Sequence, residues 1–169
     1  MISRRLLLLM TIAMLPVTVA CGQAANTPLL QPNSTDRYNL QIDTRGNHLS
    51  GILIARPTPD GPRIVTASYL GPTIFDFSML PDSMRINSCV QPMRRKAVLQ
   101  LLECDLRNTF CSCSAKLRHN RPTEKKYVTG HLLGRSVFVL YFSDDSSISR
   151  LQIRHPWIRL RLSIDPIEK

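Results

Sequence analysis

From residue 37 onward, apolar and polar side chains alternate with a period of two over several short stretches. In residues 37–43 (RYNLQID), Tyr38, Leu40 and Ile42 fall on one side and the polar residues between them fall on the other. This spacing is typical of a strand with one buried face. Comparable stretches between turn-forming residues predict four more strands, at residues 48–56, 63–70, 71–79 and 84–90. Consecutive strands with short connections indicate an antiparallel meander.

The period of the pattern changes after Pro92. From Pro92 onward the spacing is that of one face of a helix, with apolar residues at Val98, Leu101, Leu102, Leu106 and Phe110, which predicts a helix over residues 92–109. A helix with one apolar side must cover that side, and the apolar face of the sheet is the available surface. We therefore expect the helix to lie against the sheet.

The rest of the chain predicts more strands after a polar loop at residues 111–126 (CSCSAKLRHNRPTEKK). Two strands follow, and then two strictly alternating segments joined essentially by His155 and Pro156, which predicts a closing hairpin. These four segments are residues 127–133, 136–142, 148–155 and 157–164. The predicted fold class is α+β and mainly antiparallel β, with about eight or nine strands in a curved sheet or half-open barrel and one amphipathic helix on its concave face.

The first 20 residues have the composition of an export signal. Arg4 and Arg5 precede an apolar block that runs from Leu6 to Ala20, and a small residue stands at its end, where signal peptides are cleaved. A bilayer span needs roughly 20 apolar residues, so this shorter block is not expected to remain as an anchor. Residues 1–20 are therefore predicted to be removed.

Cys21 directly follows Ala20, and residues 18–21 (TVAC) resemble the bacterial lipobox, although Thr18 stands where that motif usually has Leu. The resemblance implies that Cys21 becomes the first mature residue and carries acyl chains such as palmitate, which anchor a protein to a membrane. Gly22, and no Asp, comes next, and no acidic run follows. By resemblance to Gram-negative lipoproteins, this favours the periplasmic face of the outer membrane. The alternative is an ordinary secretion signal with an incidental cysteine.

Residues 21–36 are polar, contain two prolines and show no periodicity, which predicts a flexible tether after the lipidated cysteine. Residues 37–169 suit one domain with one core. Loss of Arg4 and Arg5 with the signal lowers the formal net charge from +10 to +8. A basic domain favours anionic lipid headgroups as partners, and nucleic acid is not expected outside the cell.

The sequence contains no H-E-x-x-H metal motif, no G-x-S-x-G nucleophile motif and no glycine-rich phosphate loop. We therefore predict no catalysis, no cofactor and no metal, with a hydrolase assembled from distant residues as an alternative. The spacing of Cys111 and Cys113 near His119 is too short for a structural zinc site. Together with Cys89 and Cys104 these cysteines allow two disulfides, or Cys89 and Cys104 are free buried thiols.

Four arginines in the closing hairpin are predicted to form a ladder on one face: Arg150, Arg154, Arg159 and Arg161. Such a ladder is either a solvated outer face or a surface for lipid phosphates, which guanidinium groups bind well.

The order of elements resembles the LolA/LolB superfamily of lipoprotein-localisation factors, with local likeness at residues 68–79 (SYLGPTIFDFSM) and 149–164 (SRLQIRHPWIRLRLSI). The resemblance implies an unclosed barrel whose concave side accepts acyl chains. It assigns eight residues to a cavity or core: Leu53, Val65, Phe75, Phe77, Leu101, Leu102, Phe138 and Leu140.

Proteins like LolB also reach the membrane with an apolar residue on a loop, and the candidate loop here, residues 56–63 (RPTPDGPR), has none. This absence favours simple binding over transfer of lipoproteins into a bilayer. We expect an outer-membrane lipoprotein that binds an acyl chain or a lipid-modified partner, and the resemblance implies a place in lipid or lipoprotein trafficking. The alternative is a structural or protein-interaction lipoprotein of the envelope without a lipid cavity.

Overall fold

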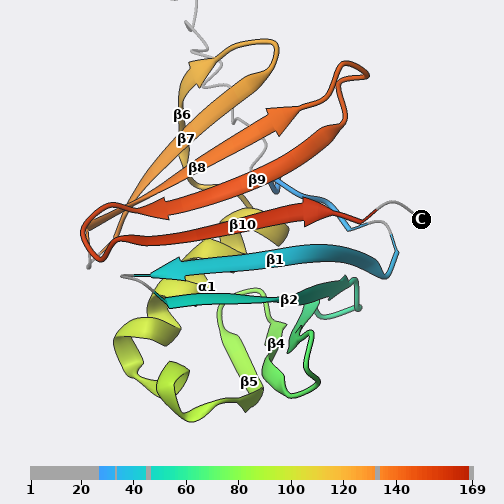
Figure 1. Cartoon of the computed structure of the whole chain (residues 1–169), viewed down its shortest axis with the longest axis vertical. Coiled ribbons are helices and arrows are strands. Elements are labelled where there is room, and N and C mark those ends of the chain that lie inside the picture. The colour runs from blue at the N-terminus through green and yellow to red at the C-terminus, as the bar shows by residue number, and fades with distance from the viewer. Residues whose placement is uncertain (1–26, 33, 45–46, 132–133, 168–169) are drawn as a thin grey trace, which may run out of the picture.

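The computed structural model describes residues 27–32, 34–44, 47–131 and 134–167, and the predicted signal and Cys21 lie outside them. The described strands form one antiparallel sheet in the order β5-β4-β3-β2-β1-β10-β9-β8-β7-β6 (Figure 1). The first five strands are β1 (Asp36–Thr44), β2 (Asn47–Arg56), β3 (Arg63–Ser68), β4 (Thr73–Met79) and β5 (Met84–Cys89). The last five are β6 (Lys116–Asn120), β7 (Glu124–His131), β8 (Gly134–Phe142), β9 (Ile148–His155) and β10 (Leu160–Pro166).

The two halves of the sheet join in the middle, where β1 pairs with β10. The chain crosses from one outer edge of the sheet to the other through a 3-10 helix (Gln91–Arg94) and the helix α1 (Lys96–Phe110). Since β5 and β6 are the two ends of the strand order, the sheet is open.

Helix α1 lies on one face of the sheet, behind β1, β2 and β10 in the view of Figure 1. Its apolar side, including Leu106 and Phe110, belongs to one buried cluster with Phe77 of β4 and Phe138 of β8. The rings of Tyr38 on β1 and Phe110 lie 5.9 Å apart between centroids. Because one helix contacts side chains from both halves, the sheet curves around it.

The backbone is adapted to this curvature where β2 passes β3. A Cβ atom added to Gly51 would lie 2.2 Å from the carbonyl oxygen of Ala67, so only glycine allows the two strands to come this close. On the other side of β3, its register with β4 shifts between Thr66 and Ala67, and such irregularities bend a strand.

These findings confirm the predicted fold class, a mainly antiparallel sheet with one helix among the described residues, although the strands number ten and not eight or nine. Strand β6 and the start of β7 lie in residues 111–126, which were predicted to be a loop. In β6 every residue except His119 is exposed. An edge strand of this kind buries little on either face and carries no alternating signal.

The closing hairpin also differs from its prediction. Its turn consists of residues 156–159, and β10 begins at Leu160. Arg159 has a φ of 53°, a left-handed conformation typical of turns.

Part of the predicted tether is ordered. Leu29 and Leu30 are buried, and their backbone N–H groups donate to the carbonyl oxygens of Asn108 and Thr109, at 3.3 and 2.7 Å. These two residues therefore pack against the end of α1 and do not act as a tether.

Candidate functional site

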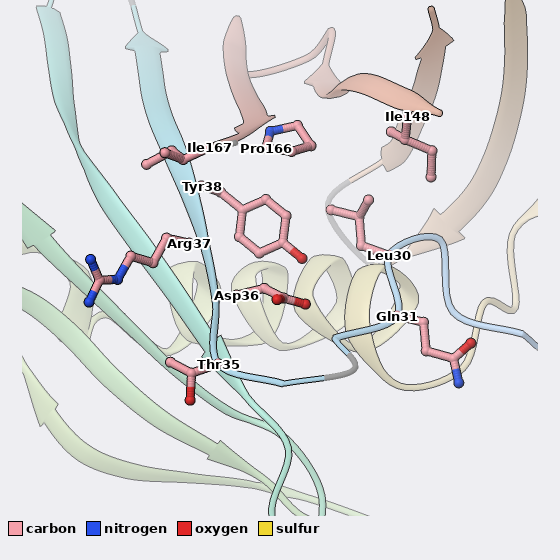
Figure 2. A pocket seen from close by; sticks show the side chains of 9 residues that line it. All are labelled: Leu30, Gln31, Thr35, Asp36, Arg37, Tyr38, Ile148, Pro166 and Ile167. Carbon is pink, nitrogen blue, oxygen red and sulfur yellow. The ribbon is translucent and has the colours of Figure 1, made fainter. Parts of the chain in front are cut away.

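A pocket of about 640 Å³ lies at the end of the sheet where β1 begins and β10 ends (Figure 2). Its volume is within the range of sites that hold small molecules, roughly 300–1,000 Å³. The lining residues come from the N-terminal segment, β1, β9 and the end of β10: Leu30, Gln31, Thr35, Asp36, Arg37, Tyr38, Ile148, Pro166 and Ile167.

The docking of the N-terminal segment builds one wall of this pocket. Leu30 is fixed by its hydrogen bond to Thr109, and the chain then loops round to enter β1 at Asp36. On the other side, Tyr38 is opposite Pro166 in the register of β1 and β10. Proline has no backbone N–H, and β10 ends here, with one further backbone hydrogen bond from the N–H of Ile167 to the carbonyl oxygen of Arg37, at 3.0 Å.

The floor of the pocket is apolar. Figure 2 shows the Tyr38 ring, Leu30, Ile148 and Pro166 around a common space. Burial, and then the negative charge of Asp36, raises the pKa of Tyr38 to about 12. Tyr38 is therefore a neutral phenol at physiological pH, and it offers one hydroxyl group in an otherwise apolar wall.

The rim of the pocket is polar and carries both signs of charge, with Asp36 and Arg37 next to each other in β1. Thr35 and Gln31 are exposed beside them. In Figure 2 the side chains of Arg37 and Gln31 point away from the apolar space. An apolar floor under a polar rim suits an amphiphilic ligand with hydrocarbon inside and a polar group at the opening.

Seven of the eight residues that were predicted to form a cavity or core are buried core residues, each at most 5 % exposed: Leu53, Phe75, Phe77, Leu101, Leu102, Phe138 and Leu140. The eighth prediction is wrong, because Val65 is half-buried and lies on the opposite face from its buried neighbours Ile64 and Thr66. None of the eight lines the pocket at the end of the sheet. All of the seven except Leu101 belong to the buried apolar cluster that includes Leu106 and Phe110 of α1.

A buried polar cluster, formed by Asp105 of α1, Ser136 of β8 and His155 of β9, connects the helix to the second half of the sheet. The Ser136 hydroxyl donates to Asp105 Oδ1 at 2.9 Å and lies 3.3 Å from His155 Nδ1, while His155 Nε2 lies 2.7 Å from Asp105 Oδ2. The three residues are 1, 0 and 3 % exposed, respectively. Sequence analysis missed this cluster, because its members are far apart in the chain.

The cluster contains the three residue types of a hydrolase triad, but not its geometry. In a triad the serine is reached by substrate and donates to the imidazole, and the carboxylate holds the other ring nitrogen. Here Asp105 also accepts a hydrogen bond from the Ser136 hydroxyl, and Ser136 is fully buried, so substrate does not reach it. This arrangement fits a role in fixing the helix to the sheet.

The predicted arginine ladder is not continuous. Arg150 forms a two-bonded ion pair with Asp165, at 2.7 and 2.9 Å. Arg154 donates to Gln152 Oε1 at 2.6 Å, and Arg161 is opposite Arg154 in the register of β9 and β10. Arg159 lies in the turn and does not belong to this face.

The four cysteines of the described region, Cys89, Cys104, Cys111 and Cys113, are free thiols. Burial, and then the neighbouring charge of Asp105, raises the pKa of Cys104 to about 11. Within the described residues no group of three or more His, Cys, Asp or Glu side chains could hold a metal ion.

Two turns carry exposed apolar side chains. Leu70, which is 94 % exposed, follows Tyr69 in the turn between β3 and β4. The loop of residues 56–63, the candidate counterpart of the membrane-reaching loop of LolB-like proteins, connects β2 and β3, and Leu70 lies in the next turn along the chain. Trp157 and Ile158 are exposed in the turn between β9 and β10.

Comparison with protein-family models gave no match, and comparison with curated proteins gave none either. Among the described residues, the helical segments are too short and too polar to cross a bilayer.

Proposed function

We propose that the protein is a non-enzymatic lipoprotein, anchored through Cys21 at the periplasmic face of the outer membrane, whose domain binds an acyl chain or a lipid-modified partner. The observation that carries this proposal is the pocket with an apolar floor at Tyr38, Leu30 and Ile148 beneath a polar rim.

The pocket offers enough apolar surface for a measurable affinity. Each methylene group moved out of water contributes roughly 0.8 kcal/mol, so burial of about eight contributes roughly 6 kcal/mol. The loss of free motion on binding offsets a large part of that gain. We therefore expect reversible binding of acyl chains, which suits transport.

Leu70 supports a role in lipid or lipoprotein trafficking. The resemblance to LolB implies a loop with an apolar residue that reaches the membrane, and Leu70 is an almost fully exposed apolar side chain in a tight turn.

A fluorescent fatty acid tests the proposal. The mature chain with Cys21→Ala is purified without detergent and titrated with the probe. Ile148→Trp fills the pocket from a half-buried position in its apolar floor, and we expect it to weaken binding at least tenfold. Ile86→Trp is the matched control, since Ile86 is 44 % exposed on β5 at the edge of the sheet. Equal binding by the two variants would rule out this pocket as the acyl site.

A structural or protein-interaction lipoprotein is the second candidate, and one observation favours it. The residues that were predicted to form a cavity, such as Phe77 and Phe138, are buried in one cluster with α1, and none of them lines the pocket. This candidate predicts that the fatty acid does not bind the mature chain and that the protein associates with an acidic partner in a salt-sensitive way.

A further inference from the structure

The turn between β9 and β10 presents the single tryptophan of the chain to solvent. Trp157 is 73 % exposed and Ile158 is 38 % exposed. Tryptophan is a large apolar side chain that proteins bury for most of its area. A tryptophan this exposed at the tip of a turn therefore indicates a surface that contacts another molecule.

The indole ring is nevertheless held in place. A Cβ atom added to Gly134, at the start of β8, would lie 2.6 Å from Trp157 Cδ1. Gly134 also has a φ of +112°, which side-chain-bearing residues rarely adopt. The ring therefore rests on bare backbone next to its own turn, and its exposure does not come from a loose loop. The turn and the start of β8 lie at the same end of the sheet (Figure 1).

Positive charge surrounds this turn. Arg159 is in the turn, Arg161 follows two residues later, and Arg135 is next to Gly134; all three are exposed. In the described part of the chain, none of these three guanidinium groups is paired with a carboxylate. The nearest acidic residue by strand register is Asp43, opposite Arg161, and its carboxylate lies 2.6 Å from His48 Nδ1.

We propose that this turn, with Trp157 and Ile158 at its tip and Arg135, Arg159 and Arg161 around it, is a contact surface for a bilayer that contains anionic phospholipids. Indole rings favour the headgroup region of a bilayer, where one side is apolar and the other wet. Guanidinium groups pair with phosphate oxygens in two-bonded geometry. The turn offers both features within a few residues.

A protein partner fits this turn less well. A stable protein interface covers roughly 800 Å² on each partner, around an apolar centre. Here the apolar part is two side chains on a four-residue turn, with arginines directly behind it. That is too little apolar surface for a protein interface but enough for an insertion into headgroups.

This contact does not depend on the pocket or on lipidation of Cys21. The pocket is at the end of the sheet where β1 begins, and the turn is at the end where β1 stops. An anchored domain that also touches the membrane through this turn would be held in a fixed orientation.

The intrinsic fluorescence of Trp157 tests the proposal directly, because the chain has no other tryptophan. The mature chain with Cys21→Ala is mixed with vesicles of phosphatidylcholine alone, or of phosphatidylcholine and phosphatidylglycerol in equal parts. We expect a blue shift of the emission and co-sedimentation with the anionic vesicles only, both weakened by salt.

Two paired substitutions separate a specific contact from general attraction by a basic domain. Replacing Arg159 and Arg161 by Gln should weaken binding about twenty-five-fold, since each basic residue near an anionic surface contributes about fivefold. Arg118→Gln with Arg121→Gln is the control, at exposed arginines of β6 and its turn, and we expect it to lower binding less than threefold. Equal losses in the two pairs, or an unshifted emission on anionic vesicles, would overturn the proposal.

Discussion

Replacement of Asp105 by Asn should strongly destabilise the fold, although the side chain keeps its size. The Asp105 carboxylate is 1 % exposed, and it bonds both to Ser136, at 2.9 Å, and to His155, at 2.7 Å. An Asn side chain has one oxygen and one NH₂ group, so one of these two partners loses its acceptor whichever way the amide turns.

The size of the effect follows from the contacts that are lost. A hydrogen bond to a charged group contributes about 1.5–3 kcal/mol, and leaving its buried partner without an acceptor costs about 1–3 kcal/mol more. We therefore expect Asp105→Asn to lower the free energy of unfolding by about 4 kcal/mol, a large share of the total of about 5–15 kcal/mol for a domain.

Urea unfolding followed by far-UV circular dichroism measures this change. Asp82→Asn, in an exposed turn between β4 and β5, is the matched control and should change the free energy of unfolding by less than about 0.5 kcal/mol. The double variant of Asp105→Asn with His155→Gln should lose much less than the sum of the single losses, since both break one network. A loss below about 1 kcal/mol for Asp105→Asn would refute this account of the cluster.

Three other predictions rest on single residues. Between pH 10 and 12 the unfolded state releases the Tyr38 proton and the folded state retains it. The free energy of unfolding should therefore fall by about 1 kcal/mol per pH unit as pH rises. Urea titrations over this range should show that Tyr38→Phe removes this part of the slope. The pKa of the Cys104 thiol is raised to about 11, so at pH 8 less of it is the reactive thiolate than in the unfolded chain. Iodoacetamide should therefore alkylate Cys104 about a hundredfold more slowly in the folded protein than in the urea-unfolded chain. Equal rates by mass spectrometry would contradict this. Gly51→Ala should destabilise the protein by about 2 kcal/mol or more, because the new Cβ meets the Ala67 carbonyl. Gly130→Ala, with open space around the new Cβ, should have little effect. Similar midpoints of urea unfolding for the two variants would contradict the close approach of β2 and β3.

The alternation of side chains was enough to predict most of the sheet. Strand β1 buries every second residue from Tyr38 to Ile42, and α1 buries one stripe that includes Leu102 and Leu106. Strand β6 could not be predicted in this way, because Lys116 and its neighbours at the sheet edge are exposed on both sides.

The pocket and the buried polar cluster depend on contacts between distant segments. The pocket wall at Leu30 exists because residues 29 and 30 pair with the end of α1, and nothing in a polar, proline-containing segment predicts that pairing. Likewise, Asp105 falls among polar residues of the helix, and only the fold shows that it faces Ser136 and His155.

The central claim is that the domain carries hydrocarbon from another molecule in the pocket beside Tyr38. Native mass spectrometry of the mature chain with Cys21→Ala, purified without detergent, tests it most directly. The account predicts one bound acyl lipid per chain in this protein and in Ile86→Trp, and none in Ile148→Trp. An empty protein, or a lipid that remains bound in Ile148→Trp, would contradict it.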